Sequence, residues 1–326
     1  MEELPYALLS YSGGSLGFPK YYESIVKHHF HIVYLEELNN NKELYAPKVE
    51  ALLLWRHLPV VTKELLDSLP NLKVISSSGA GVDHLDLKMI SSYNIKVTNT
   101  PGVGNDATAD MGMALMLASA RNLVEGHRIL CSPDTKNIDF NWLGDDITEA
   151  TLGIIGMGGV GYCIAQRAKA FRMNILYHNR KRRAMEEELA VGAEYCSKMA
   201  DLLQRSDFVM VVVNLTPETH HLIGQEQLRL MKPTATLINI SRGQVIDQDA
   251  LVDALNCGVI KAAALDVTYP EILPRDHPLL AVKNLILTPH IGNATYKTRR
   301  KVAEKIVLDA KNIIKGLPVT SVVTTA

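Results

Sequence analysis

Gly156, Gly158 and Gly161 stand at a fixed spacing near the middle of the chain, in the segment Gly156-Met-Gly-Gly-Val-Gly161. An apolar run of strand length, residues 152–155, precedes this segment, and a helical pattern over residues 160–171 follows it. In that setting the glycines permit a tight turn, a close approach of the backbone to a pyrophosphate, and close packing of the helix on the strand. The N–H groups at the start of such a helix bind phosphates. We therefore predict a dinucleotide-binding fold, with cofactor contacts from Gly156, Gly158, Gly159, Val160 and Gly161.

Apolar runs of strand length alternate with helical patterns along the chain, which predicts parallel sheets covered on both faces. Before the glycine segment, we expect strands at 6–10, 31–35, 51–55, 73–77 and 95–98, and helices at 20–29, 62–69 and 85–93. The second series has strands at 151–156, 174–178, 208–213, 235–240, 262–267 and 285–288. One helix, 293–316, closes the chain and is too little for a third domain. We predict two doubly wound α/β domains: a flavodoxin-like substrate domain, 1–102 plus 293–326, and a Rossmann nucleotide-binding domain, 103–292.

Composition excludes several classes of protein. The 34 basic and 35 acidic side chains give a formal charge of −1, so there is no net field to hold nucleic acid or an anionic membrane. No apolar run approaches the roughly 18 residues of a membrane helix, and the first residues do not have the pattern of a signal peptide. The four cysteines form no Cys-x-x-Cys pair, which argues against a metal centre and a disulfide framework. We expect a reduced, cytoplasmic protein without a bound metal.

Four consecutive cations follow the second predicted strand of the nucleotide domain. A site for NAD would place a carboxylate here, for the ribose hydroxyls. The chain instead has Asn179, followed by Arg180, Lys181, Arg182 and Arg183. Such a run is either a solvated surface or a site for the 2′-phosphate of NADP. We favour the phosphate site, with contacts from Asn179, Arg180 and Lys181 and a preference for NADPH over NADH.

Polar residues also follow the later strands of this series. Arg242, Asp266 and His290 lie at or just after the ends of three successive strands, and Glu271 follows Asp266 in a loop bounded by prolines. Each of them alone is commonly a surface charge or a capping residue. Ligands of open α/β sheets gather beyond the carboxyl ends of the strands. We therefore expect these side chains to lie near the cofactor.

The combined motifs resemble those of D-isomer-specific 2-hydroxyacid dehydrogenases, and most closely those of glyoxylate/hydroxypyruvate reductases. The resemblance extends over about residues 72–316. It rests on the glycine segment, on Asn239-Ile-Ser-Arg-Gly243, on Leu265-Asp-Val267 with Glu271, on Pro289-His-Ile-Gly292, and on matches at 99–101, 105–110 and 215–219. It implies the NADPH-dependent reduction of small 2-keto acids to D-2-hydroxy acids by hydride transfer.

The resemblance also implies a role for each site residue. Arg242 would bind the carboxylate and keto oxygen of a substrate lying in the cleft between the domains. His290 would be the general acid, kept protonated and oriented by Glu271. Backbone N–H groups of the loop 78–81, including those of Ala80 and Gly81, would hold the substrate carboxylate. Asp266 would bind the nicotinamide carboxamide. Other cofactor contacts would come from Thr108, Leu215, Thr216, Pro217, Ile240 and Gly292, in addition to Arg242 and His290.

Some positions leave the substrate open. Asn293 adjoins His290 where these reductases usually carry a small residue, and Asp110 stands where Glu is commoner. The segment Trp55-Arg-His57 follows a strand, so it either faces the substrate or forms a solvated loop. In the first case Arg56 and Asn293 would contact the substrate. Alternative functions are a 2-ketogluconate-type reductase, another D-2-hydroxyacid dehydrogenase of this fold, and an NAD(H)-sensing corepressor-like binding protein.

A long apolar stretch, residues 107–130, is rich in small and sulfur-containing side chains. We predict one helix here, packed on several sides. Together with the segment that carries Trp142, this helix is expected to form the interface of a homodimer.

Overall fold

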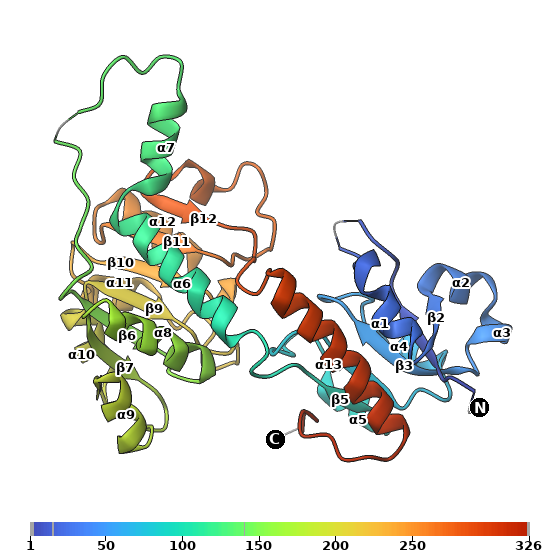
Figure 1. The fold of residues 1–326 in the computed structure, drawn as a ribbon. Helices are drawn as coiled ribbons and strands as arrows, with labels where there is room; N and C mark the ends of the chain where they lie inside the picture. The colour runs from blue at the N-terminus through green and yellow to red at the C-terminus, as the bar shows by residue number, and fades with distance from the viewer. Residues whose placement is uncertain (1–2, 15, 140, 325–326) are drawn as a thin grey trace. The chain divides into compact units, whose positions relative to one another are not determined.

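A computed structural model describes residues 3–14, 16–139 and 141–324. The chain divides into two compact units, Met1–Gly104 with Ala294–Ala326, and Asn105–Asn293. Each unit is built on one parallel sheet with helices, so the predicted fold class is confirmed (Figure 1).

The first unit contains a five-stranded parallel sheet in the order β2-β1-β3-β4-β5. This is the order of doubly wound, flavodoxin-like sheets. Its strands are β1 (Tyr6–Leu9), β2 (His31–Tyr34), β3 (Val49–Leu54), β4 (Val74–Ser77) and β5 (Lys96–Thr98). Its helical segments are η1 (Lys20–Tyr22), α1 (Glu23–Lys27), α2 (Leu35–Asn40), α3 (Lys42–Tyr45), α4 (Lys63–Asp67) and α5 (Leu87–Ser92).

The last helix of the chain, α13 (Tyr296–Ile314), belongs to the first unit and packs against β3 and β4. Thr295 begins it, because its side chain accepts a hydrogen bond from the N–H of Thr298. Val302, Ile306 and Ala310 are buried at the four-residue spacing of one helix face. The chain therefore starts and ends in the same unit.

The second unit contains a seven-stranded parallel sheet in the order β12-β11-β10-β9-β6-β7-β8. Its strands are β6 (Thr151–Ile155), β7 (Asn174–His178), β8 (Ala193–Tyr195), β9 (Phe208–Val211), β10 (Thr236–Asn239), β11 (Ala262–Leu265) and β12 (Leu285–Leu287). Its helical segments are α6 (Asn105–Ala120), α7 (Leu123–Cys131), α8 (Gly159–Ala170), α9 (Met185–Val191), α10 (Met199–Arg205), α11 (Gln225–Leu230), η2 (Gly243–Val245), α12 (Gln248–Asn256) and η3 (Pro278–Ala281).

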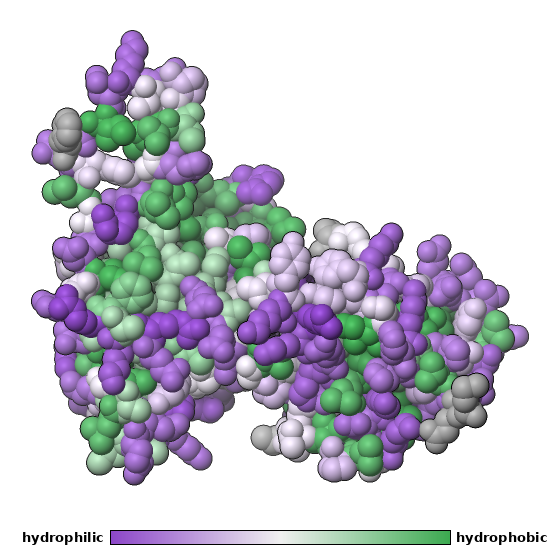
Figure 2. Space-filling view, viewed as in Figure 1, coloured by the Kyte–Doolittle hydropathy of each residue, from purple (hydrophilic) through white to green (hydrophobic). Residues whose placement is uncertain are grey.

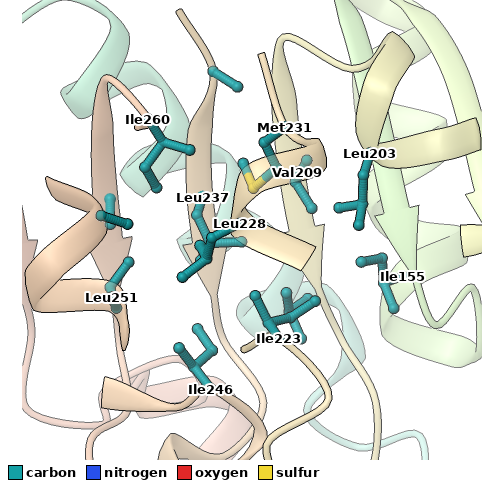
Figure 3. Close-up of a cluster of buried hydrophobic side chains, with 14 of the residues drawn as sticks. Ile155, Leu203, Val209, Ile223, Leu228, Met231, Leu237, Ile246, Leu251 and Ile260 are labelled. Atoms are coloured by element: carbon teal, nitrogen blue, oxygen red, sulfur yellow. The ribbon is translucent and has the colours of Figure 1, made fainter. Parts of the chain in front are cut away.

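Both faces of this second sheet are buried, which explains its continuous apolar strands. Along β9, Val209 and Val211 join one core cluster, and Phe208 and Met210 join the other. Figure 3 shows part of the first cluster. Helices α6 and α8 pack on the second cluster, and the Nε–H of Arg167 in α8 donates to Asp110 in α6 at 2.7 Å. These layers hold the carboxyl ends of the strands in fixed positions.

The predicted single helix over 107–130 is wrong. Helix α6 ends at Ala120, and α7 begins only at Leu123. Between them Asn122 has φ 49°, in the left-handed region that asparagine tolerates better than most residues. Helix α6 is buried on several sides, as expected, whereas α7 has no buried residue. It stands out from the rest of its unit (Figure 1).

No helix among residues 3–14, 16–139 and 141–324 is long and apolar enough to cross a membrane.

Candidate active site

The glycine segment lies at the end of β6 and opens α8. Gly156 has φ +99°, a conformation that favours glycine. A Cβ atom on Gly161 would lie 2.4 Å from the carbonyl oxygen of Gly156, so the helix can only approach the turn without a side chain there. In contrast, a Cβ on Gly158 would meet nothing within 4 Å, because this backbone faces open space. The loop therefore fits the phosphates of a dinucleotide.

The peptide of Met157, inside this loop, is held by the residue that follows β7. The Oδ1 atom of Asn179 accepts a hydrogen bond from the N–H of Met157 at 2.7 Å, and its Nδ2 group donates to the Met157 carbonyl at 3.3 Å. Asn179 is thus next to the glycine loop, as predicted for the residue after the second strand. Its amide is already bonded to that loop.

The four cations after Asn179 separate into two pairs. Arg182 donates two hydrogen bonds to Glu188, at 2.8 and 2.7 Å, and Arg183 forms an ion pair with Glu187. Arg180 and Lys181 are exposed and make no ion pair with the described part of the chain. The pKa of Glu218 is lowered, mainly by hydrogen bonds from Thr216 and from its own backbone and to a smaller extent by the charge of Arg180. Arg180 therefore lies near the predicted adenine segment, 215–217.

The carboxylate of Asp266 organises the turn that carries His290. Asp266 is buried, and its two oxygens accept hydrogen bonds from the Thr288 hydroxyl at 2.6 Å and from the N–H groups of Ile291 and Gly292 at 2.9 and 2.7 Å. A Cβ on Gly292 would lie 3.0 Å from this carboxylate and 3.3 Å from Thr108 of α6. These residues are therefore neighbours, as their shared assignment to the cofactor site requires.

His290 and Glu271 form a close pair. The Nδ1 atom of His290 is 2.7 Å from Oε1 of Glu271, and both side chains are partly exposed. His290 has φ 52°, and its N–H is shared between the carbonyls of Asp266 and Thr288, at 2.8 and 3.0 Å. Because Nδ1 is occupied by the carboxylate, Nε2 is the ring nitrogen that can exchange a proton with a ligand. The sequence predicted this pair from residues 19 positions apart.

Arg242 follows β10 in a turn built by Asn239. The buried amide of Asn239 donates to the Arg242 carbonyl at 2.9 Å and accepts from the Ser241 N–H and hydroxyl at 2.9 and 2.7 Å. A Cβ on Gly243 would lie 2.2 Å from the Thr268 carbonyl carbon, so only glycine permits this approach to the segment after β11. Ile240, at the start of the turn, contacts α6 at Gly112.

The loop 78–81 belongs to the first unit, and its carbonyls accept hydrogen bonds from the two residues that follow β5. The carbonyls of Ser78, Gly79 and Ala80 accept hydrogen bonds from the Thr100 hydroxyl at 3.0 Å, the Thr100 N–H at 3.1 Å and the Asn99 amide at 2.6 Å. In the part of the chain that the structure describes, the N–H groups of residues 79–81 donate to no acceptor. Three adjacent N–H donors of this kind suit a carboxylate.

The segment after β3 is only partly exposed. Trp55 is buried against Phe18, with ring centroids 5.1 Å apart, so the expectation that this residue faces a ligand or solvent is wrong. Arg56 is exposed, and its N–H donates to the Ser78 hydroxyl at 2.9 Å, at the start of the loop 78–81. Asn293 is half-buried and lies directly after Gly292.

Sequence reasoning missed the residues that position the others, namely Asn239, Thr288, Asn99 and Thr100. Asn239 and Asn99 lie in quoted motifs, but nothing in the sequence shows which carbonyl a buried amide will reach. Outside residues 1–2, 15, 140 and 325–326, no group of three or more His, Cys, Asp or Glu side chains could hold a metal ion.

The sheet that carries the glycine loop also carries, after later strands, an arginine and a carboxylate-paired histidine, a set that is typical of nicotinamide-dependent oxidoreductases. The family model described as "D-isomer specific 2-hydroxyacid dehydrogenase, NAD binding domain" matches residues 113–292, more than half of the chain. The chain belongs to this family. The predicted resemblance is confirmed, and a nicotinamide cofactor follows from the matched domain.

Comparison with individual proteins supports the same family. The chain is 45% identical over 259 residues to a protein named glyoxylate reductase from Thermococcus litoralis, covering 78% of this chain and 76% of that one. A solved glyoxylate reductase from Paecilomyes thermophila has a TM-score of 0.82 and 30% identity, with 99% of each chain covered. An NADPH-dependent glyoxylate/hydroxypyruvate reductase from Sinorhizobium meliloti, solved with NADP and malonate, has a TM-score of 0.83 and 27% identity, with 98% of this chain and 97% of that one covered.

Proposed function

We propose that this chain reduces small 2-keto acids, glyoxylate to glycolate and hydroxypyruvate to its D-2-hydroxy acid, and uses NADPH in preference to NADH. The observation that carries the proposal is the 2.7 Å pair of His290 and Glu271, on the turn held by Asp266 after β12. This pair can supply a proton to an oxygen atom. The names of the relatives favour the two small keto acids.

His290 is the general acid in this proposal. Glu271 accepts a hydrogen bond from Nδ1, which orients the ring and leaves Nε2 for the keto oxygen. When bound, reduced nicotinamide supplies the hydride that the carbonyl carbon accepts. His290 then loses its proton to the new hydroxyl and must be protonated again before the next turnover.

Arg242 and the loop 78–81 bind the substrate in this proposal. The planar guanidinium of Arg242 donates to the carboxylate and the keto oxygen, which polarises the carbonyl before the hydride arrives. The N–H groups of residues 79–81, including those of Ala80 and Gly81, donate to the same carboxylate. Arg56 bonds to the start of this loop through Ser78, and Asn293 follows the turn that carries His290. Both side chains would adjust the fit to the rest of the substrate.

The glycine loop holds the pyrophosphate, and Asp266 the nicotinamide amide. A carboxylate has about four acceptor positions, and three of those of Asp266 are used within the protein. One position is left for the carboxamide. Other contacts of the proposal are Thr108, Leu215, Thr216, Pro217, Ile240 and Gly292.

The preference for NADPH rests on Arg180 and Lys181. Both are exposed, the charge of Arg180 acts on Glu218 beside the predicted adenine segment, and the neutral Asn179 stands where a carboxylate would repel a 2′-phosphate. The ion pairs of Arg182 and Arg183 remove these two residues from the proposed phosphate site. A charge-assisted contact of about 1.5–3 kcal/mol corresponds to a preference of roughly 10- to 100-fold.

The proposal is tested by steady-state assays with glyoxylate, hydroxypyruvate and 2-ketogluconate, each with NADPH and with NADH. We expect the highest kcat/KM with one of the two small acids and NADPH, and a lower NADPH preference at high salt. Asn179→Asp combined with Arg180→Ala should reverse the order of the cofactors. Highest efficiency with 2-ketogluconate would favour that alternative, and binding of NADH without turnover would favour a sensing protein.

We also propose a homodimer formed through α7 and the segment after it. No residue of α7 is buried. We call α7 and the segment after it the α7 arm, and its exposed apolar side chains include Leu123, Leu130, Trp142 and Leu143. Figure 2 shows hydrophobic side chains on the part of the surface that α7 occupies. An apolar arm of this kind suits the same arm of a second copy. Helix α6 is buried within its own unit and is not part of the proposed interface.

A further inference from the structure

Arg183 is enclosed by the protein, unlike the two cations assigned to the 2′-phosphate. Its side chain is 22% exposed, Nη1 donates to the carbonyl of Met157 at 2.8 Å, and Nη2 pairs with Glu187. The guanidinium lies over the ring of Tyr162 in α8, 4.7 Å from its centroid. Its Nε atom is buried and has no hydrogen-bond partner among the described residues. Each end of the guanidinium fork is therefore bonded within the protein, and one of the two bonds goes to the glycine loop.

The group that Arg183 holds is the centre of the glycine loop. The carbonyl of Met157 accepts from Arg183 and from Asn179, and its N–H donates to Asn179. The side chain of Met157 is fully buried in the core below the loop. Gly156 and Gly158, on either side, are the residues whose backbone turns and approaches a pyrophosphate. These bonds therefore hold the two peptide groups on either side of Met157, which join it to Gly156 and Gly158.

The backbone of Arg183 is also held in place by hydrogen bonds. Its N–H donates to the hydroxyl of Tyr177 in β7 at 3.0 Å, and this hydroxyl donates to Glu188. Arg182 pairs with the same carboxylate. Segment 182–188 is therefore tied to the sheet, and the side chain of Arg183 extends from it to the loop.

We propose that Arg183 is a positioning residue for the glycine loop: it fixes the Met157 peptide for the pyrophosphate of NADH and NADPH alike, and it does not select between them. The proposal rests on the nicotinamide cofactor of the family, and it stands whether or not Arg180 confers a preference for NADPH.

The test is Arg183→Gln, with Arg180→Gln as the matched control and Arg183→Lys as the conservative variant. Arg183→Gln should raise the Kd of NADH and of NADPH by the same factor, about tenfold, the worth of one charge-assisted hydrogen bond. At saturating cofactor, kcat should stay within about twofold, because the reacting groups are untouched. Arg183→Lys should recover part of the affinity, because an ammonium can still donate to the Met157 carbonyl.

Several results would overturn the proposal. A loss confined to NADPH would make Arg183 a phosphate ligand, and unchanged Kd values would show that the loop does not need it. A fall in kcat equal to the loss of affinity, or a lysine variant no better than glutamine, would indicate general structural damage. Arg180→Gln should weaken NADPH alone. If it affects both cofactors equally or neither, the NADPH preference fails while the proposal for Arg183 is unaffected.

Discussion

Glu188 is a buried carboxyl group near the nucleotide loop, and its pKa is far below the ordinary value. It is almost fully buried, and hydrogen bonds from Arg182 and Tyr177 lower its pKa from 4.5 to about 2. Burial, and then the contact with Glu188, raise the pKa of Tyr177 to about 12. A carboxyl group with a lowered pKa stabilises the folded state above its ordinary pKa, and that contribution is lost as the pH falls from about 4.5 toward 2.

Glu188→Gln should therefore reduce the free energy of unfolding by about 1–2 kcal/mol at neutral pH, because Arg182 and Tyr177 lose a charged acceptor. The difference from the unmodified protein should narrow between pH 4.5 and 2. Denaturant unfolding followed at a series of pH values measures it. Glu186→Gln, an exposed position on the same helix, is the control. A difference that stays constant with pH would contradict the account of this carboxylate.

At the scale of elements, long segments with a clear period were predictable and short ones were not. Every strand with a continuous apolar run was found. Strand β8 has only three residues at a sheet edge, and α2 and α3 lie in a polar stretch. None of these elements shows a repeating pattern of apolar residues. Asn122 ends α6 through its backbone conformation, which composition does not reveal. Arg242, Asp266 and His290 were found because each lies within three residues of the end of a strand.

The loop after β4 should depend on the start of the segment after β5. Asn99→Ala removes the hydrogen bond to the carbonyl of Ala80, and the loop N–H groups then lose their fixed direction. We expect the KM for glyoxylate to rise about tenfold, the worth of one to two hydrogen bonds, while the KM for NADPH stays unchanged. Ser92→Ala removes the hydrogen bond from Ser92 to the Met89 carbonyl within α5, and it should change neither KM value. Equal changes in both KM values would refute this role.

At the scale of the whole molecule, the chain passes between the two units at 104–105 and again at 293–294. Candidate substrate groups lie in both: residues 79–81 in the first, and Arg242 and His290 in the second. We expected the last helix to return to the first unit, because a single helix is too little for a third domain. The sequence could not show that α7 would stand out without a buried residue, because that depends on where α6 ends.

The exposed arm leads to a prediction about assembly. Light scattering at micromolar concentration should give twice the chain mass of 36.0 kDa. Leu130→Asp, on α7, should reduce the mass to that of one chain, because a carboxylate would be buried in the apolar interface. Leu189→Asp, on the similarly exposed face of α9, should leave the dimer intact. A single species of 36.0 kDa for the unmodified protein would contradict the dimer.

The most direct test of the proposed chemistry is the turnover of His290→Ala, measured with glyoxylate and NADPH and accompanied by cofactor titration. Loss of a general acid should lower kcat by about 100-fold or more, while the Kd of NADPH stays within about twofold because the glycine loop is untouched. His31→Ala, in β2 of the first unit, should keep normal turnover. If His290→Ala turns over at close to the normal rate, then His290 does not supply the proton and the proposed chemistry is wrong.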